Sequence, residues 1–490
     1  MTHILNQNTK LISDKLLGVL RNTAPADLEW KQSRDGFDIP VYNGVPLHST
    51  YSVTKEAERQ LAAVAADCDA VIAVGVGAGY HLAQLCRDKQ IIAVPLNISL
   101  FAATAAHQDM SSYLSNIIFC DVSELYQQLY QLYTQRQSVK VAVTVSSYCL
   151  AHDREAADRV CRAAAAAAAS AKTEVATIRK FGIVWHNNIR KNLQRCFDGG
   201  YNMSPLVISS RIILVVGAGY SLTQHAGFIR DNRQLFYIAA ADTAAAVLMH
   251  NGIVPDSIWT FDAQTISSQH FFCLRDTPQP VRVFADFCSP IYLRTHNVST
   301  TLVFSSHPYR RILEAAGWTL RNIDSGCGNI GAAAVHFFRE YFPEIPLVTV
   351  GIDFAYYNGY SYSAGSYLES SRLTKQDYFY TAQHFDAGIT YRDKSAGEIG
   401  GWRTTPLMQG YAAAITEDIF TLSDSPFCRM KHITHDEVSA LAVSGEYRLD
   451  FRLSSSEVTE SDFRRVETEY LKKDKTPLLP LEMAKTMHNS

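Results

Sequence analysis

The stretch from Arg211 to Gln264 constrains the fold most, because short apolar runs alternate there with helical patterns. The pattern predicts a buried strand at Ile212–Val216, a glycine turn, and a helix that begins near Ser221. The elements expected next are a strand at Leu235–Ala239, a helix at Thr243–His250 and a strand at Ser257–Phe261. This alternation is typical of βαβ units and therefore predicts a parallel sheet.

A ligand site is expected at the carboxyl ends of these strands, where open parallel sheets bind their ligands. Gly217, Gly219, Asp242 and Asp262 all fall at such ends. Glycine lets the backbone approach a ligand closely, and the free N–H groups of the next helix attract phosphate. Gly219→Val is thus expected to abolish binding while leaving the melting of the fold largely intact. A tight turn without a ligand is the competing interpretation, because Leu222 replaces the third glycine of the GxGxxG pattern.

Composition narrows the class of protein. The chain has 490 residues, a length that suggests about three domains. A net charge of −3 provides no basic field for nucleic acid. No apolar run approaches the roughly 18 residues of a membrane span, and no signal peptide is apparent at the start. The ten cysteines show no CxxC spacing, which fits reduced thiols, so we expect a cytoplasmic protein without membrane or nucleic-acid partners.

The sequence of the first 150 residues indicates a peripheral N-terminal segment followed by one domain. Residues 1–50 form the segment, in which Asn43-Gly44 is a hairpin turn signal. Residues 51–150 are expected to form a Rossmann-like domain, with a buried strand at Ala70–Val74 that ends in the glycine turn Gly75–Gly79. After the next strand the chain reads Pro95-Leu96-Asn97, without the carboxylate that usually binds a ribose. This domain is therefore expected to carry out no chemistry.

The rest of the chain divides into three expected regions. Residues 151–205 form a helical linker, residues 206–425 the central domain, and residues 426–490 a C-terminal region with a frayed tail. The central domain continues with strands at Val281–Ala285, Thr301–Ser305 and Leu347–Val350, and with a helix at Leu407–Leu422. Small residues from Asp324 to Gly331 open a further helix and offer a second anion cradle. The tyrosine-rich stretch after Asp353 is interpreted as a loop over a site.

The order of these motifs resembles a known family. The chain contains VGVGAGYHL, TIRKFGIVWHNNIRKNL, GAGYSL, NGIVPDSIWTFDAQ, SGCGNIGAAA and VTVGIDFAYYNG, in that order. It resembles the Maf (motility-associated factor) proteins of flagellated bacteria, whose central domain is also described as 6-hydroxymethylpterin diphosphokinase MptE-like. The central domain is similar as well to bacterial sialyltransferases that use CMP-activated nonulosonic acids.

The resemblance implies a fold and a reaction. The fold is α/β, with a Rossmann-like N-terminal domain and a sialyltransferase-like parallel-sheet domain. The reaction is transfer of a sialic-acid-like sugar, such as pseudaminic or legionaminic acid, from CMP to Ser or Thr of flagellin, as flagellum assembly and motility require. No cofactor and no metal ion are implied. The matching residues are Gly217, Gly219 and Ser221 for the nucleotide turn, Asp242 for the polar position after the second strand, Ser325 and Gly326 before a helix, and Asp353 and Tyr356 beside the donor sugar.

The chemistry assigns further roles. An acceptor hydroxyl needs a base, and a histidine suits that role near neutral pH. His384 lies at the distance after the GIDF aspartate that the sialyltransferases imply, with His307 as the competing base. Tyr356 and Tyr362 are assigned to the leaving phosphate. The sialyltransferases have an asparagine where this chain has Ala218, so one cytidine contact is missing.

Two other functions remain open at this point. A pterin diphosphokinase would transfer diphosphate from ATP with Mg²⁺, which Asp262, Asp286 and Asp353 would hold. A flagellin-binding accessory factor would keep the fold without the catalysis, and the loss of the asparagine at Ala218 is compatible with it.

Overall fold

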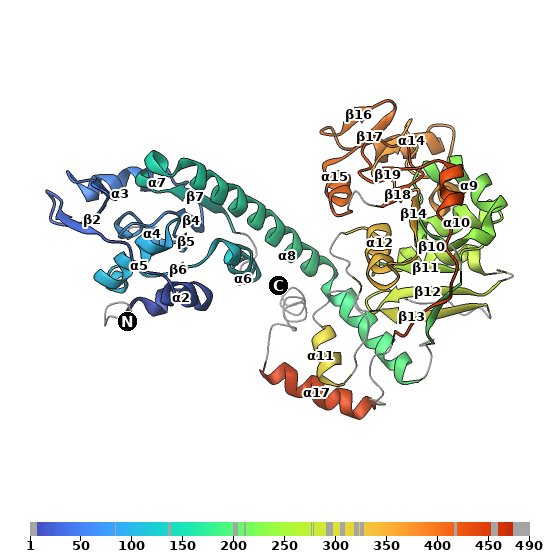
Figure 1. Ribbon diagram of the computed structural model, residues 1–490, viewed down its shortest axis with the longest axis horizontal. Coiled ribbons are helices and arrows are strands. Elements are labelled where there is room, and N and C mark those ends of the chain that lie inside the picture. Colours follow the sequence, from blue (N-terminus) through green and yellow to red (C-terminus); the bar gives the residue numbers. More distant parts are fainter. Residues whose placement is uncertain are drawn as a thin grey trace. The chain divides into compact units, whose positions relative to one another are not determined.

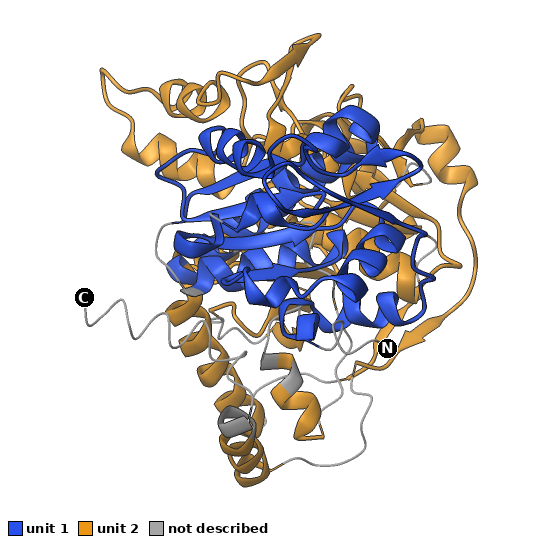
Figure 2. Ribbon diagram, turned by 90° about the vertical axis from the view of Figure 1, so that its left-hand side faces the viewer, with its two compact units in different colours: residues 1–180 blue, residues 181–490 orange. Residues whose placement is uncertain are grey.

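The structure is a computed structural model with two compact units, residues 1–180 (unit 1) and residues 181–490 (unit 2), coloured in Figure 2. The boundary falls inside one 44-residue helix, α8 (Arg154–Phe197), and thus within the expected linker. The described residues are 7–83, 85–135, 139–198, 204–209, 212–275, 277, 279–290, 297–303, 309–317, 323, 328–415, 419–451 and 459–473.

Unit 1 begins with a short helical segment and a small antiparallel sheet. The first elements are η1 (Thr9–Leu11), α2 (Asp14–Arg21), β1 (Glu29–Gln32), β2 (Asp38–Tyr42) and β3 (Val45–Pro46). Asn43 and Gly44 connect β2 to β3 with φ angles of 49° and 78°. Both angles lie in the left-handed region that a two-residue hairpin turn of this type requires, which confirms the turn predicted from the sequence.

The main sheet of unit 1 is parallel, in the order β6-β5-β4-β7. Every residue of β4 is buried, as expected of a strand covered on both faces. The strands are β4 (Ala70–Val74), β5 (Gln90–Val94), β6 (Ile117–Phe119) and β7 (Val141–Val145). The connecting elements are α3 (Val53–Ala62), η2 (Tyr80–Leu82), α4 (Leu85–Asp88), α5 (Ile98–His107), η3 (Met110–Ser112), η4 (Val122–Glu124), α6 (Leu125–Gln135) and α7 (Ser147–His152). The strand order reverses between β4 and β7.

Unit 2 is built on an eight-stranded sheet in which every pairing is parallel (Figure 1). Its spatial order is β13-β12-β11-β10-β9-β14-β18-β19. This arrangement confirms the Rossmann-like fold class. The strands are β9 (Ile212–Val216), β10 (Phe236–Ala241), β11 (Ser257–Thr260), β12 (Val281–Asp286), β13 (Val298–Val303), β14 (Leu347–Val350), β18 (Phe420–Thr421) and β19 (Lys431–His432).

Side chains of the central strand β9 alternate between two hydrophobic cores. Ile212, Leu214 and Val216 pack with α9 (Ser221–Asp231), α10 (Asp242–His250) and the C-terminal part of α8. Ile213 and Val215 pack on the other face with α12 (Ile330–Tyr341) and α15 (Pro406–Ala413). All five strand residues have no exposed surface, because helices cover both faces of the sheet.

One helix predicted from the sequence is wrong. The apolar stretch from Leu407 to Leu422 was expected to be a single helix, but α15 ends at Ala413. Phe420 and Thr421 instead form β18, which pairs in parallel with Val348 and Thr349 of β14. The strand forms here because β14 has an unpaired edge whose backbone groups bond to Phe420 and Thr421. Local periodicity does not reveal such a long-range pairing.

The remaining elements surround this sheet. A second small sheet joins β15 (Tyr356–Tyr357), β17 (Trp402–Thr404) and β16 (Gly397–Ile399), and β8 (Leu206–Ile208) pairs with β20 (Tyr447–Leu449). The 3-10 and α-helices are η5 (Arg233–Leu235), η6 (Thr265–Leu274), α11 (Tyr309–Ala315), α13 (Tyr367–Lys375), α14 (Ala382–Thr390), α16 (His435–Ala440) and α17 (Glu460–Lys473). None of the helices in the described part of the chain combines the length and the apolar character that a bilayer crossing needs.

Candidate functional site

The candidate site lies where the strand order of unit 2 reverses. The chain moves from β9 through β10 to β13 on one side, and β14, β18 and β19 continue on the other side of β9. Ligands of such sheets bind at this point, beyond the carboxyl ends of the strands. A cavity of about 420 Å³ opens there, a size typical of a small-molecule site. Its lining comes from the ends of β9, β10 and β14, from the starts of α12 and α15, and from Ser361 and Tyr362.

Gly217 and Gly219 let two strand ends approach each other. A Cβ atom on Gly217 would lie 2.2 Å from the carbonyl oxygen of Gly351, and one on Gly219 would lie 2.4 Å from Oδ2 of Asp353. The N–H of Gly219 donates to the carbonyl oxygen of Gly351 at 2.8 Å. Both glycines also line the cavity. The expectation that Gly219→Val leaves the melting temperature largely unchanged is therefore wrong. The introduced valine side chain would overlap backbone and buried side-chain atoms that cannot move aside easily.

Ser221 and Asp353 tie the same two strand ends together. Asp353 is 1% exposed, and its two oxygens accept hydrogen bonds from the N–H of Ser221 at 3.0 Å and from the Ser221 hydroxyl. The Ser221 oxygen in turn accepts the N–H of Gly351 at 2.8 Å. Burial raises the pKa of Asp353, although the bonds from Ser221 oppose the shift. Asp353 lines the cavity, and its hydrogen bonds to Ser221 join the segments that follow β9 and β14, which is a positioning role.

Asp242 is a buried carboxyl group at the wall of the cavity. It is 2% exposed, accepts the hydroxyl of Thr260 at 2.8 Å, and accepts the N–H of Thr243 at 2.7 Å. Burial raises its pKa, while the charge of His270 and the two hydrogen bonds act in the opposite direction. A carboxyl group with a raised pKa in a cavity is a candidate for proton transfer.

Asp262 does not line the cavity. Its carboxylate accepts the N–H of Gln264 at 2.9 Å and the hydroxyl of Ser267, so it closes a turn just before η6. A bond from the N–H two residues later to an aspartate side chain is a common local turn. Asp262 does follow a strand, as the sequence predicted. Its carboxylate oxygens accept hydrogen bonds from Gln264 and Ser267, however, and do not face the cavity.

Three helices begin at the cavity: α10 at Asp242, α12 at Ile330 and α15 at Pro406. Asn329 caps α12 by accepting the N–H of Ala332 at 3.1 Å. The N–H groups of Ile330 and Gly331 bind no partner in the described residues. Helix N-termini carry partial positive charge, so this wall of the cavity suits an anion. Ser325 and Gly326, which the sequence assigned to this region, lie outside the described residues.

Tyrosines form another wall. Tyr356 and Tyr362 line the cavity as the tyrosine-rich loop predicted, and burial raises the pKa of both phenols. Ser363 holds this segment over the first glycine turn, because its N–H donates to the carbonyl oxygen of Ala218 at 2.8 Å and its hydroxyl donates to that of Gly219 at 2.6 Å. Tyr411 of α15 also lines the cavity. Tyr411 lies in a stretch without a motif, so no sequence signal predicted its place at the cavity.

Of the two histidines proposed as the base, only His384 lies in the described residues. His384 is exposed on α14 and does not line the cavity, and its ring lies 6.2 Å from the ring of Tyr380. His307 lies outside the described residues. The titratable groups among the described lining residues are two carboxyls, Asp242 and Asp353, and three tyrosines.

A metal site was proposed only for the diphosphokinase alternative. Of the three carboxyl groups named for it, Asp353 lines the cavity and Asp262 and Asp286 do not. Within the described ranges, no group of three or more His, Cys, Asp or Glu side chains is arranged to hold a metal ion.

The chain is similar to known proteins in sequence over part of its length and in fold. Residues 187–359 match the family described as 6-hydroxymethylpterin diphosphokinase MptE-like. No curated protein matches the sequence. The structure is similar to that of a Maf glycosyltransferase from Magnetospirillum magneticum AMB-1, with 13% identity and a TM-score of 0.56 over 95% of this chain and 77% of that chain.

A hydrogen sulfide-producing enzyme from Fusobacterium nucleatum aligns over 69% of this chain and 98% of its own at 12% identity, but its TM-score of 0.13 carries no argument about fold. The matched range 187–359 contains the glycine turn of β9, Asp242 and Asp353. These residues therefore lie in the stretch that matches the MptE-like family, and the fold of the chain is similar to that of the Maf glycosyltransferase.

Proposed function

We propose that this protein is a glycosyltransferase that moves a nonulosonic acid from a CMP donor to Ser or Thr of flagellin in the cytoplasm. The observation that carries the proposal is the N-terminus of α12, where the N–H groups of Ile330 and Gly331 are free in the described residues and lie at a cavity at the strand-order reversal of unit 2. The likeness to a Maf glycosyltransferase fold supports the same class of reaction.

The cavity suits the donor's chemistry. A CMP-activated nonulosonic acid carries a phosphate and a carboxylate, and the N–H groups of Ile330 and Gly331 face a site for one of these anions. The phenols of Tyr356 and Tyr362 retain their protons because burial raises their pKa, so they donate hydrogen bonds to the leaving phosphate. No metal ion is required in this proposal.

The transfer step needs a base. The acceptor oxygen forms a bond to the anomeric carbon, the bond from that carbon to the phosphate oxygen breaks with its electron pair, and the hydroxyl proton passes to the base. Asp242 lines the cavity with a raised pKa, whereas His384 does not line it, so we assign the base to Asp242. His384 remains the alternative drawn from the resemblance.

Calorimetry and a transfer assay test the proposal. CMP and CMP-sialic acid are expected to bind the full chain, and incubation with donor and flagellin is expected to raise the intact mass of flagellin by whole sugar units. Absence of both binding and mass increase at millimolar donor would refute the proposal. Deletion of the gene is expected to lower the mass of flagellin in the cell by the same units and to impair motility.

A pterin diphosphokinase is the second candidate, and the MptE-like match at residues 187–359 favours it. It predicts that ATP with Mg²⁺ binds in place of the CMP donor and that a hydroxymethylpterin gains the mass of a diphosphate. The same calorimetric series, with ATP and Mg²⁺ as a further arm, separates the two functions.

A further inference from the structure

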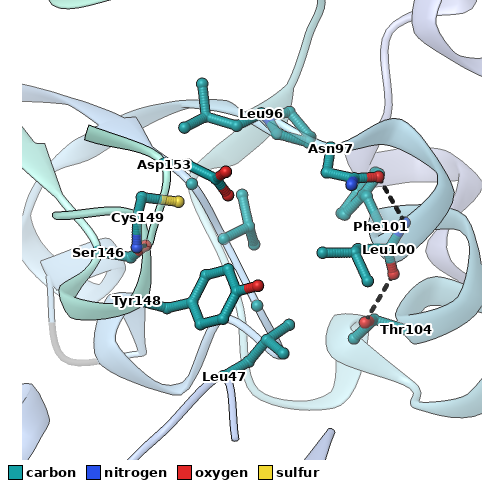
Figure 3. A pocket seen from close by; sticks show the side chains of 14 residues that line it. Leu47, Leu96, Asn97, Leu100, Phe101, Thr104, Ser146, Tyr148, Cys149 and Asp153 are labelled. Carbon is teal, nitrogen blue, oxygen red and sulfur yellow. Dashed lines mark hydrogen bonds between the residues drawn. The ribbon is translucent and has the colours of Figure 1, made fainter. Parts of the chain in front are cut away.

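Unit 1 has its own strand-order reversal, between β4 and β7, but the crevice there is closed. Only about 30 Å³ remains, the share of a single water molecule. Leu47 and Tyr148 extend into this space beside Asp153 (Figure 3). The N–H of Ala78, in the glycine turn, donates to Nε2 of His48 at 2.9 Å. Side chains of the protein therefore fill the space that a nucleotide would occupy, and His48 accepts a backbone N–H that a nucleotide would otherwise bind.

A larger cavity of about 510 Å³ lies next to this crevice and shares Leu47 and Tyr148 with it. The loop from Pro46 to Ser52, helix α3 and helix α7 form its walls. The charged, imidazole and aromatic side chains that line the cavity include those of Tyr51, Lys55, Glu56, Arg59, Tyr148 and His152.

One wall of this cavity is basic. Lys55 and Arg59 lie one turn apart on α3, so both side chains leave the same helix face. Both are exposed, and neither forms an ion pair with a carboxylate in the described residues. His152 at the end of α7 lies on the same cavity. The side chains of Lys55 and Arg59 therefore give this wall its positive charge.

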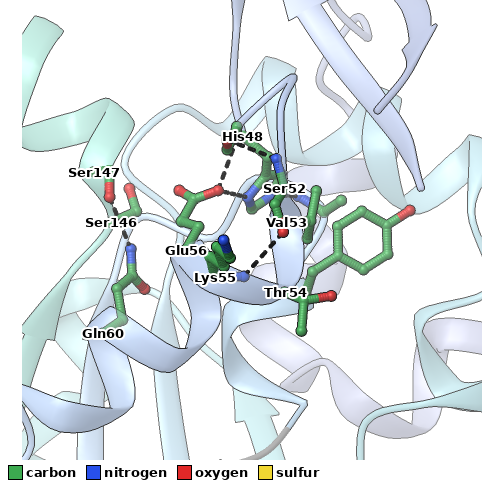
Figure 4. A network of polar contacts seen from close by, with 12 residues as sticks. His48, Ser52, Val53, Thr54, Lys55, Glu56, Gln60, Ser146 and Ser147 are labelled. Atoms are coloured by element: carbon green, nitrogen blue, oxygen red, sulfur yellow. Dashed lines mark hydrogen bonds and ion pairs between the residues drawn. The ribbon is translucent and has the colours of Figure 1, made fainter. Parts of the chain in front are cut away.

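The carboxylate of Glu56 lines the same cavity as the two cations. Oε2 of Glu56 accepts the N–H of Ser49 at 2.8 Å and lies 3.5 Å from Nδ1 of His48 (Figure 4). Burial opposes ionisation of Glu56, but hydrogen bonds from His48 and from the Ser49 amide hold its pKa below the ordinary value. Oε1 has no hydrogen-bond partner in the described residues, so a charged acceptor remains for a hydroxyl group of a ligand.

Helix α3 does not supply the anion site through its N-terminus. Asp35 accepts the N–H groups of Val53 and Thr54, and Ser52 accepts that of Lys55 at 3.2 Å. Recognition of an anion in this cavity therefore rests on the Lys55 and Arg59 side chains. The rings of Tyr51 and Tyr148 add flat apolar surface, on which the C–H face of a sugar packs.

We propose that this cavity of unit 1 binds an anionic sugar, with its acid group at Lys55 and Arg59 and a hydroxyl group at Glu56. The site is separate from the cavity of unit 2, and the inference does not rest on the proposed function. A carboxylate and a phosphate present the same chemistry to the two cations, so sugar acids and sugar phosphates are both ligands of this class.

Calorimetry with the full chain tests the proposal. The probes are glucuronate, N-acetylneuraminate and glucose 6-phosphate, with neutral N-acetylglucosamine, CMP and a short poly-glutamate peptide as comparisons. At least one anionic sugar is expected to bind, and the double variant Lys55→Gln/Arg59→Gln is expected to weaken that binding tenfold or more. Arg162→Gln/Lys172→Gln removes the same charge from exposed positions of α8 in unit 1 and is expected to leave the affinity unchanged.

A second variant separates the cavity from the charge. Ala151→Trp on α7 fills the cavity without changing a charged group and is expected to abolish the binding while the far-ultraviolet circular dichroism stays native. Saturation by glucuronate, N-acetylneuraminate or glucose 6-phosphate identifies the acid group that the site prefers. The proposal is overturned if no anionic sugar binds, if only CMP or the peptide binds, or if the Arg162/Lys172 control weakens binding as much as the Lys55/Arg59 variant does.

Discussion

Gly219 shows how a single residue without a side chain sets the geometry of the candidate site. A Cβ atom there would meet Oδ2 of Asp353 at 2.4 Å and the carbonyl oxygen of Gly351 at 2.8 Å. We predict that Gly219→Ala lowers the free energy of unfolding of unit 2 by about 1–3 kcal/mol, the usual cost of overpacking. Chemical denaturation measures this change. Gly227 in α9 is the control, because nothing lies within 4 Å of its added Cβ, and Gly227→Ala is expected to be neutral or stabilising.

The assignment of the base to Asp242 and its assignment to His384 predict opposite effects of substitutions on the transfer rate. If Asp242 is the base, Asp242→Asn slows sugar transfer on the order of a hundredfold, as removal of a positioned base usually does, while His384→Ala leaves the rate within a few-fold. Because burial raises the pKa of Asp242, kcat/KM is expected to fall with falling pH at a higher pH than for an ordinary carboxylate. The transfer rate from pH 4 to 8 measures both effects. The reverse order of the two variants would return the role to His384.

His81 predicts how the stability of unit 1 depends on pH. It is 1% exposed, neither ring nitrogen has a hydrogen-bond partner in the described residues, and burial lowers its pKa to about 3 from 6.5. Between these values the unfolded chain binds a proton that the folded chain does not, so stability falls as pH decreases from 6.5 towards 3. His81→Leu is expected to make this decline shallower in denaturation at several pH values. An unchanged slope would show that His81 is not responsible.

At the scale of elements, helix α8 is fixed to unit 2 by side-chain amides. Asn188 donates to the carbonyl oxygens of Ala263 at 3.1 Å and Cys288 at 2.8 Å, and Asn192 donates to those of Phe287 and Ser289 at 2.8 and 2.9 Å. These carbonyls follow β11 and β12. Two asparagines four residues apart thus hold the loops at the carboxyl edge of the sheet against one helix face.

Removal of one anchor is predicted to destabilise unit 2. Asn188→Leu leaves two carbonyl oxygens without this donor and is expected to cost about 1–3 kcal/mol, the desolvation penalty of unpaired buried polar groups. The neighbouring Asn187 is exposed, and Asn187→Leu changes the same atoms without breaking the contacts. Urea denaturation of both variants gives the comparison, and equal midpoints would contradict the anchoring role.

At the scale of the whole molecule, two units with separate hydrophobic cores share one chain. Leu16, Ile91 and Phe119 belong to the core of unit 1, whereas the two cores of unit 2 lie on the faces of its eight-stranded sheet. Separate cores are expected to unfold as separate cooperative transitions. We predict two transitions in calorimetry, of which CMP raises only the one that belongs to unit 2, because ligand binding stabilises the unit that binds. Gly219→Ala lowers the same transition and so identifies it.

An equal rise of both transitions with CMP would contradict this division. It would mean that unit 1 binds the nucleotide as well, or that the two units unfold together. An anionic sugar, by contrast, is expected to raise the transition of unit 1 alone, and the Lys55→Gln/Arg59→Gln variant is expected to lose that rise.

The sequence by itself determined the strands and their direction. Ile212–Val216, Ala70–Val74 and Leu347–Val350 were predicted with the bounds that the structure has, because each is a mainly apolar run that turn residues delimit. The parallel sheets followed from the helices between the strands. Asp242 and Tyr356 were also placed near a site, because residues at the carboxyl ends of parallel strands meet at one edge.

Only the tertiary structure decided how distant segments meet. β14 lies next to β9 across more than a hundred residues, and this pairing puts Gly351 against Gly217 and makes Asp353 a partner of Ser221. It also turns part of the predicted helix at Leu407–Leu422 into β18. Periodicity and turn signals report local preferences, whereas strand order, burial and the pKa of a carboxyl group depend on contacts between residues far apart in the chain. For that reason the sequence located the edge of the sheet, and the fold alone decided which side chains line the cavity there.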